Sequence, residues 1–336
     1  MSNRQTTPII VWLFAGCFLI FAMVLIGGIT RLTHSGLSMV EWKFTGSLPP
    51  LNEQDWQEEF SKYQQSPEFQ KINTHFTVED FKGIFWWEFI HRMLGRLIGI
   101  VFIIPLIWFI IRKKLPPGFL KNAAVLLLLG FCQGLLGWIM VKSGLNKVPH
   151  VSHYLLASHL SLAFITFGFT FWYALNLIYG KQNNNPVHAI SKNAIILLAL
   201  VALQIVYGAF VAGMQAGALC PTWPKMCNSW MPSEVSSMLP AWRNFLENPY
   251  GVQFIHRTLA ILILAFAAVL FYRKRIQNIT QQQDKLITFV LFGITAQVIL
   301  GIATLLLHVP VSLASLHQVG AFFLFSIIIT LIHRTR

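Results

Sequence analysis

The chain has 336 residues, of which 55% are hydrophobic and only 11% are charged, against roughly 25% charged in ordinary soluble domains. This composition excludes a soluble globular protein and favours one that resides in a lipid bilayer. The net charge of +13 does not indicate nucleic-acid binding, because no soluble stretch interleaves basic and aromatic residues.

Eight apolar runs are long enough to cross a bilayer, which takes about 20 residues per helix. We therefore expect an all-α integral membrane protein with eight transmembrane helices. The first run does not read as a cleavable signal, because it is long and no small-x-small cleavage site follows it. The runs lie near residues 9–28, 84–111, 122–141, 151–179, 193–213, 251–272, 286–307 and 312–333.

Basic residues gather in the segments that follow the even-numbered runs. The positive-inside rule assigns such segments to the cytoplasm, so both chain termini are expected there. The N-terminus up to Pro8 lacks an Arg-rich amphipathic presequence, which favours a bacterial plasma membrane over an organelle. The basic residues concerned are Arg112, Lys113, Lys114, Lys181, Lys192, Arg273, Lys274, Arg275, Arg334 and Arg336.

The longest polar stretch is the first outer loop, residues 43–83, which holds most of the acidic residues. Its spacing permits two short surface helices, and we expect its acids to be solvated. The corresponding loop of the second half, about 218–250, holds Cys220 and Cys227. We expect these two to form a disulfide on the oxidising outer face. The bond would either brace the loop or exchange with an external thiol carrier.

An internal repeat runs through the chain. The element Glu88-x-x-His91-Arg92 in the second run recurs as Gln253-x-x-His256-Arg257 in the sixth. A Gln-x-x-Leu-Gly element likewise recurs at residues 133–137 and 297–301. Consistent spacing between the copies predicts a duplication.

The duplication predicts two tandem four-helix bundles, over residues 1–180 and 181–336. Each half then carries two histidines at similar depth, on its second and fourth helices. Imidazoles from facing helices give axial ligation of a haem, so we expect one haem per half. A single intramembrane histidine is more often structural, but four at repeat-equivalent positions favour ligands. The four are His91, His159, His256 and His317.

A catalytic zinc site is disfavoured, because such sites usually gather three protein ligands and each half offers two. Arginines near the ligands could pair with the anionic haem propionates, although snorkelling to lipid headgroups is the alternative for each. These candidates are Arg31, Arg92, Arg96 and Arg257.

Glu88 lies three positions before His91, so the two share a helix face. A carboxyl group in apolar surroundings beside a haem is suited to general acid/base chemistry or to stabilising positive charge. The alternative is a structural ion pair with Arg92 or Arg96. In the second half the neutral Gln253 takes the equivalent position.

Taken together, these motifs resemble the haem A synthases of bacterial and mitochondrial membranes. The resemblance covers nearly the whole chain and points to the longer members, which have an extended first outer loop. It rests on the Gly27-Gly28-Ile29-Thr30-Arg31-Leu32-Thr33 exit with Ser35-Gly36-Leu37-Ser38-Met39, on Glu88-x-x-His91-Arg92, on Val151-Ser152-His153-Tyr154 before His159, on Thr222-Trp223-Pro224, on Phe254-Ile255-His256-Arg257 and on Leu316-His317-Gln318.

The resemblance implies an enzyme that oxidises the C8 methyl of haem O to a formyl group, giving haem A for terminal oxidases. It implies haem b as the enzyme's own cofactor, four haem-facing histidines, and Glu88 as the acidic residue. We expect His91 and His159 to hold haem O in the first half. We expect His256 and His317 to hold haem b in the second.

One departure concerns the cysteines. Members of one branch carry a Cys pair in the first outer loop, whereas the pair here, Cys220 and Cys227, lies in the second-half loop. A redox role attached to the first-half pair therefore does not transfer to this chain.

Besides haem O and the lipid bilayer, a haem O synthase and an electron donor are expected partners, and a homo-oligomer is left open. Two other functions fit paired histidines: a quinol-linked di-haem b-type electron carrier, and a haem transporter or chaperone. A carrier needs no carboxylate beside one haem. Conversion of haem O to haem A by membranes that hold the protein separates these readings.

Overall fold

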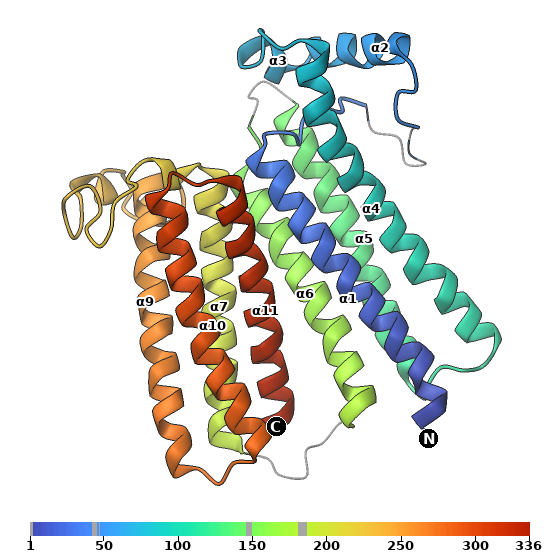
Figure 1. The fold of residues 1–336 in the computed structure, drawn as a ribbon, viewed down its shortest axis with the longest axis vertical. Helices are drawn as coiled ribbons and strands as arrows, with labels where there is room; N and C mark the ends of the chain where they lie inside the picture. The colour runs from blue at the N-terminus through green and yellow to red at the C-terminus, as the bar shows by residue number, and fades with distance from the viewer. Residues whose placement is uncertain (1–2, 42–45, 47, 146–149, 181–186) are drawn as a thin grey trace. The chain divides into compact units, whose positions relative to one another are not determined.

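The computed structural model describes residues 3–41, 46, 48–145, 150–180 and 187–336, and Figure 1 shows its helices. Eight helices in this part of the chain are long and apolar enough to cross a membrane. The predicted eight-helix membrane fold is thereby confirmed. Large apolar side chains such as Phe131 and Phe292, 68% and 72% exposed, lie on the outward helix faces, where lipid would cover them.

The long helices are α1 (Asn3–Leu32), α4 (Val78–Ile111), α5 (Phe119–Gly144), α6 (His153–Tyr179), α7 (His188–Gly213), α9 (Pro249–Arg273), α10 (Gln281–Leu306) and α11 (Val311–Thr335). Several extend beyond the predicted apolar runs. For example, α4 begins at Val78 because Thr77 and Asp80 form a capping box that adds polar turns ahead of the apolar run.

The chain divides into two compact units, Phe18–Leu155, and Met1–Cys17 with Leu156–Arg336. In the second of these, α7, α9, α10 and α11 contact one another and lie side by side in Figure 1. They enclose a core that includes Leu197, Ile263 and Ile328. The C-terminal half thus forms a four-helix bundle. The matching bundle of the N-terminal half and the boundary at 180/181 stay predictions.

Two short helices form in the first outer loop, α2 (Glu53–Gln64) and α3 (Pro67–Lys71), as the spacing predicted. Trp56, Phe60 and Tyr63 on α2 are buried in one apolar cluster with Phe81 and Phe85 of α4. Their spacing of three and four residues places the three side chains on one helix face. The segment is therefore packed onto α4 rather than freely solvated, as far as the structure describes it; residues 43–45 and 47 lie outside the described part.

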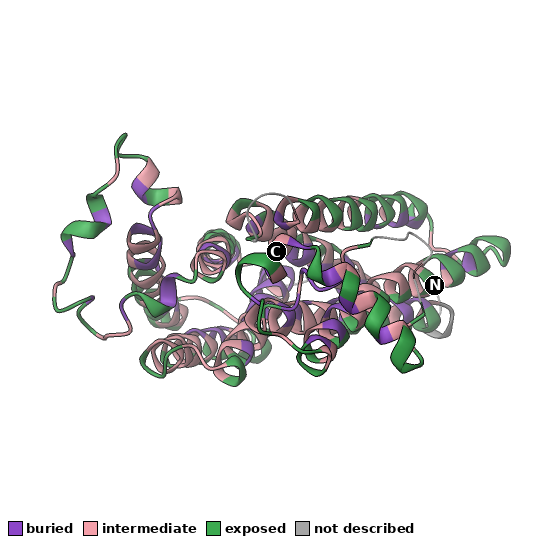
Figure 2. Cartoon of the chain, turned by 90° about the horizontal axis from the view of Figure 1, so that it is seen from above, coloured by how far each residue is buried: buried purple, intermediate pink, exposed green. Residues whose placement is uncertain are grey.

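Three further short helices belong to the second half: α8 (Arg243–Leu246), and the 3-10 turns η1 (Ala216–Ala218) and η2 (Ser233–Ser236). Another 3-10 turn, η3 (Lys274–Ile276), continues α9. Figure 2 shows exposed positions, in green, along these loop segments and along the outward faces of the long helices. Buried positions, in purple, are interspersed among intermediate ones, in pink, along the helices.

Candidate functional site

The two histidines of the second half lie in one bundle, His256 on α9 and His317 on α11. Glycines on the other two helices make room for them. A Cβ atom at Gly208 of α7 would lie 3.3 Å from Cε1 of His256, and one at Gly301 of α10 would lie 3.1 Å from Cε1 of His317. Each imidazole therefore packs against a helix surface that has no side chain.

A glutamine accompanies each of these histidines. The Nε2 atom of Gln204 donates to the carbonyl oxygen of His256 at 3.0 Å and lies 3.3 Å from its Nε2. With its amide oriented to satisfy its neighbours, Gln297 donates to the carbonyl oxygen of His317 at 2.9 Å and lies 3.3 Å from its Nδ1. These contacts fix the orientation of both rings.

Sequence reasoning missed Gln204 and Gly208. They have the same Gln-x-x-x-Gly spacing as Gln297 and Gly301, and both pairs direct the amide and the glycine to one histidine. A search for the same Gln-to-Gly spacing without the leucine would have found them.

These donors fit a haem iron better than a metal ion held by protein alone. Among the described residues no group of three or more His, Cys, Asp or Glu could hold a metal ion. Two neutral imidazoles on facing helices are the donor set of bis-histidine haem ligation. The Nδ1 atom of His256 is buried without a hydrogen-bond partner among the described residues, so hydrogen bonding within the fold does not fully use this ring.

In the first half, His91 lies on α4 beside Gly27 of α1. A Cβ atom at Gly27 would approach Cε1 of His91 to 2.9 Å, closer than the corresponding approach at Gly208. The predicted partner, His159, lies on α6 and belongs to the other compact unit. Its pairing with His91 therefore stays a prediction.

Glu88 is buried, with 2% of its surface exposed. Its Oε1 accepts from Nε and Nη2 of Arg92 at 3.0 and 2.6 Å. Its Oε2 accepts from the hydroxyl of Ser38 at 2.7 Å and the backbone N–H of Met39 at 2.8 Å. The ion pair with Arg92, which the sequence left open as an alternative, is thus present. Both oxygens of the Glu88 carboxyl accept from hydrogen-bond donors of the described residues.

The guanidinium of Arg92 also binds the loop that follows α1. It donates to the carbonyl oxygen of Glu41 at 2.9 Å and to that of Met39 at 2.8 Å. Glu88 and Arg92 together therefore clamp residues 38–41 onto α4, beside the histidine that lies between them in sequence. We call this set the first clamp.

The second half has an equivalent set, the second clamp. Gln253 is also 2% exposed, and its Nε2 donates to the carbonyl oxygen of Cys220 at 3.2 Å. Arg257 donates to the carbonyl oxygens of Pro224 and Lys225 at 2.9 and 3.4 Å. In both halves, the residues three positions before and one position after the histidine hold a loop. This loop follows α1 in the first half and α7 in the second.

The arginine candidates differ in how far the protein engages them. Four donor contacts engage Arg92, whereas Nη1 of Arg257 is buried without a partner among the described residues. Arg31 lies in the last turn of α1, and Arg96 packs beside Gly46, where a Cβ atom would come within 3.3 Å of its Nε. The described residues thus leave one buried guanidinium donor of Arg257 available to an anion.

Cys220 and Cys227 form a disulfide, with their Cα atoms 5.4 Å apart. Cys220 is fully buried, and its carbonyl oxygen is the one that Gln253 binds. The disulfide is thus joined directly to the second clamp.

A second buried carboxyl, that of Glu68 on α3, is only 6% exposed. The hydroxyl of Tyr63 donates to Oε2 of Glu68 at 3.1 Å, and Nδ2 of Asn73 donates to that hydroxyl at 2.8 Å. Burial raises the pKa of Glu68 to about 7; the Tyr63 hydrogen bond opposes this shift and the negative charge of Glu88 adds to it. The prediction of solvated acids is wrong for Glu68, because the aromatic face of α2 packs over this region.

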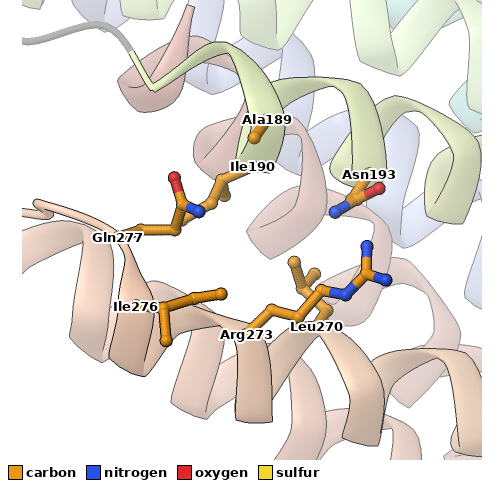
Figure 3. Close-up of a pocket in the computed structure, with 7 residues that line it drawn as sticks. All are labelled: Ala189, Ile190, Asn193, Leu270, Arg273, Ile276 and Gln277. Carbon is orange, nitrogen blue, oxygen red and sulfur yellow. The ribbon is translucent and has the colours of Figure 1, made fainter.

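A separate cavity of about 230 Å³ lies between the start of α7 and the end of α9, far along α9 from His256. Figure 3 shows the Arg273 guanidinium directed across it toward Asn193. Apolar side chains, among them Ile190, Leu270 and Ile276, form the rest of its wall. The cavity contains none of the predicted ligands and is not part of the histidine sites.

Known proteins match this chain over nearly its whole length. The family model described as cytochrome oxidase assembly protein, COX15-CtaA, matches residues 10–329. A heme A synthase of Flavobacterium johnsoniae is 43% identical over 340 residues, and one of Flavobacterium psychrophilum is 45% identical over 341, each alignment covering 99% of both chains. A heme A synthase of Nitrosospira multiformis is 42% identical over 333 residues, covering 98% of this chain and 94% of that one. The chain therefore belongs to the COX15-CtaA family of cytochrome oxidase assembly proteins.

Proposed function

We propose that this protein is a haem A synthase, which oxidises the C8 methyl group of haem O to a formyl group and supplies haem A for terminal oxidases. The observation that carries the proposal is the identity of 43% to a heme A synthase across 99% of both chains. The eight spanning helices support a multi-pass protein. We place it in a bacterial cell membrane with both termini in the cytoplasm.

The resident cofactor of the proposed enzyme is haem b, held through its iron by His256 and His317. Their location on two helices of one bundle, the flanking glycines and the two glutamine contacts support this assignment. When bound, this group supplies one-electron transfer. The second clamp is neutral at Gln253, and Arg257 has an Nη1 donor ready for a propionate.

The substrate haem O occupies the first half, with its iron held by His91 and His159 and with Arg31, Arg92 and Arg96 as propionate candidates. Glu88 is the acidic residue of this site. Its contacts favour one of the two chemical roles that the sequence suggested. Stabilising positive charge at the reacting carbon leaves every contact of Glu88 in place. Accepting a proton would require the loss of a donor or of the Arg92 pairing.

Paired histidines alone would serve an electron carrier or a haem transporter equally well. The difference between the two clamps supports the enzyme, because a carrier needs no buried carboxylate beside only one of its two haems. The reaction also requires a haem O synthase to supply substrate and an electron donor or acceptor as partner.

The test uses membranes from cells that make haem O but no haem A of their own. Production of this protein should lead to haem A in extracted haems, measured by chromatography. His91→Ala should abolish the product, whereas His75→Ala, an exposed histidine of the first outer loop, should not. Bound haem without any conversion by the wild-type protein would instead support the electron carrier.

A further inference from the structure

We propose that two glutamines, Gln204 and Gln297, hold the histidines of the second half as permanent ligands, whereas a methionine at the matching position of the first half allows haem to be exchanged. That methionine is Met23, and the ligand it leaves able to let go is His91. All three are positioning residues, because they act through the histidines. This inference rests on the proposed function, which requires one haem to stay and the other to be replaced in every turnover.

Four helices carry the same short spacing, in which a glycine follows a glutamine or a methionine by four positions. Residues at this spacing lie on one helix face, one turn apart. Three copies have glutamine, and only the copy on α1 has methionine. The first half therefore has one glutamine of this kind where the second half has two. The copies are Met23 to Gly27, Gln133 to Gly137, Gln204 to Gly208 and Gln297 to Gly301.

In the second half, the glycine and the glutamine of a copy meet the same histidine. Gly208 leaves space for the ring of His256. One turn before it on α7, Nε2 of Gln204 donates to the carbonyl oxygen of that histidine at 3.0 Å. Gln297 makes the same kind of contact with His317, at 2.9 Å. Each amide is thereby fixed beside a ring.

An amide can pair with an imidazole nitrogen in either protonation state, because it carries both a donor and an acceptor. Oε1 of Gln204 is buried without a partner among the described residues, and so is Nδ1 of His256. A ring that binds iron through Nε2 has its proton on Nδ1, and a hydrogen bond from that N–H fixes the ring and makes it a stronger ligand. Oε1 of Gln204 supplies the acceptor. The ring must reorient for this, because its Nε2 faces the amide in the structure.

The second pair needs no such reorientation. The amide of Gln297 already lies against Nδ1 of His317, at 3.3 Å. Nε2 of His317 is then the nitrogen that would bind iron, and the amide holds the other side of the ring.

In the first half, α1 presents a methionine at the corresponding position. Gly27 lies against the ring of His91. Met23, one turn before Gly27, packs beside Gly95, where an added Cβ would come within 3.2 Å of its Cε. Gly95 in turn follows His91 by one turn of α4. Met23 therefore has the place that Gln204 has in the second half, but its thioether has no donor and is only a weak acceptor.

This difference matters for release of a ligand bond. Breaking an iron–imidazole bond leaves the electron pair on the nitrogen, so no oxidant or reductant is involved, and the ring must turn away before the iron rebinds. An amide hydrogen bond opposes that rotation. A thioether does not, so Met23 favours exchange at His91. The alternative is that the glutamines only fill space, in which case any unbranched side chain of similar length would serve.

Gln204→Met tests the proposal, because methionine is also unbranched and fills a similar space. The purified variant should release haem b to apomyoglobin about tenfold faster than the wild type. Its haem b should also titrate at a higher potential, because a ligand ring without the N–H hydrogen bond is less basic and stabilises ferric iron less. Absorption spectra measure the release, and a spectroelectrochemical titration measures the potential.

Gln283→Met is the matched control. Gln283 is buried on α10 and donates to the carbonyl oxygen of Arg334 at 2.7 Å. The control therefore also removes an amide–carbonyl contact from the same bundle, but at the opposite end of α10 from Gly301. It should release haem b at the wild-type rate and keep the wild-type potential.

Met23→Gln is the reciprocal change. Haem O loaded into this variant should leave roughly tenfold more slowly, while the release of haem b should not change. Haem A output should fall even though haem O binds more tightly, because release then limits turnover. Chromatography of the haem that reaches apomyoglobin distinguishes haem O from haem b.

Wild-type release and potential in Gln204→Met would overturn the proposal, and so would equal effects in Gln283→Met, since both outcomes indicate packing alone. Release of haem O at the wild-type rate from Met23→Gln would overturn the part that concerns His91. If the wild-type protein makes no haem A at all, the proposed function fails. The release and the potential of haem b still report on Gln204 in that case, because neither measurement needs turnover.

Discussion

The two clamps use the same backbone geometry with different charge. In the first, Glu88 and Arg92 bind residues 38–41 after α1. In the second, Gln253 and Arg257 bind carbonyl oxygens of the loop after α7. Glu88 and Gln253 are equally buried.

The comparison separates two tasks that a single residue could combine: holding the loop against the helix, and taking part in the chemistry. An amide suffices to hold the loop in the second half, so bracing does not require a carboxylate. A buried ion costs free energy even when it is paired. The charge in the first half is therefore best explained by the chemistry that we propose for that half alone.

The largest difference between the halves should appear in the histidine ligands. Replacing His256 or His317 with alanine should remove the low-spin haem b spectrum from the purified protein, because each supplies one axial ligand. Replacing His159 should leave that spectrum in place while abolishing haem A formation. Absorption spectra of the reduced proteins check this. A full b-type spectrum in both the His256 and the His317 variant would contradict the assignment.

Glu88→Gln makes the first clamp resemble the second. We expect haem still to bind, since an amide can brace the loop, while haem A formation falls by about 10²–10³ as the fixed charge is lost. Haem content and product are measured on the same membranes. The matched control is Glu247→Gln, which removes another Glu–Arg pair four residues apart, at 2.7 Å from Arg243, and should leave activity near the wild type. Near-normal haem A output from Glu88→Gln would exclude Glu88 from the chemistry.

Much of the fold was predictable, because a spanning helix is specified by its own apolar residues. The repeat likewise indicated the histidine positions, and His256 and His317 do lie in one bundle. The clamps were not predictable in detail. Glu88 meets Ser38 and Met39, about fifty positions away in sequence, and local patterns do not encode such contacts.

The burial of Glu68 was missed for a related reason. An acid in a polar loop looks solvated unless one knows that the aromatic face of α2 will pack on α4. Helix ends were also underestimated, because polar capping residues such as Thr77 extend a helix beyond its apolar run.

Alanine at two of the histidine-facing glycines, Gly27 and Gly208, should sharpen the comparison on a smaller scale. The added Cβ would lie 2.9 Å from the His91 ring at Gly27, but 3.3 Å from the His256 ring at Gly208. Overpacking of this kind costs about 1–3 kcal/mol, so Gly27→Ala should weaken haem O binding roughly tenfold, and Gly208→Ala should reduce haem b retention by less. Haem titrations of the purified variants measure both.

Gly83→Ala is the control for both substitutions, since this glycine of α4 has nothing within 4 Å of an added Cβ. It should bind both haems as the wild type does. Equal effects at Gly27 and Gly208 would show that the tighter approach to His91 carries no functional consequence.

The smallest effect on haem is expected from removing the disulfide between Cys220 and Cys227. The described part of the first outer loop has no corresponding bond. In the double variant Cys220→Ser/Cys227→Ser, the second clamp remains, because Gln253 binds a backbone carbonyl of residue 220 and not its sulfur. If the disulfide only braces the loop, haem b content and haem A output should change less than about twofold, although the loop should be cut faster by protease. Bonds that close short loops contribute about 2–3 kcal/mol of stability.

If the bond instead exchanges with an external thiol carrier, haem A output should depend on the two sulfurs and fall while haem b stays bound. Thiol alkylation before and after reduction is the accompanying measurement on the wild type, and free alkylation of both cysteines without reductant would eliminate both versions.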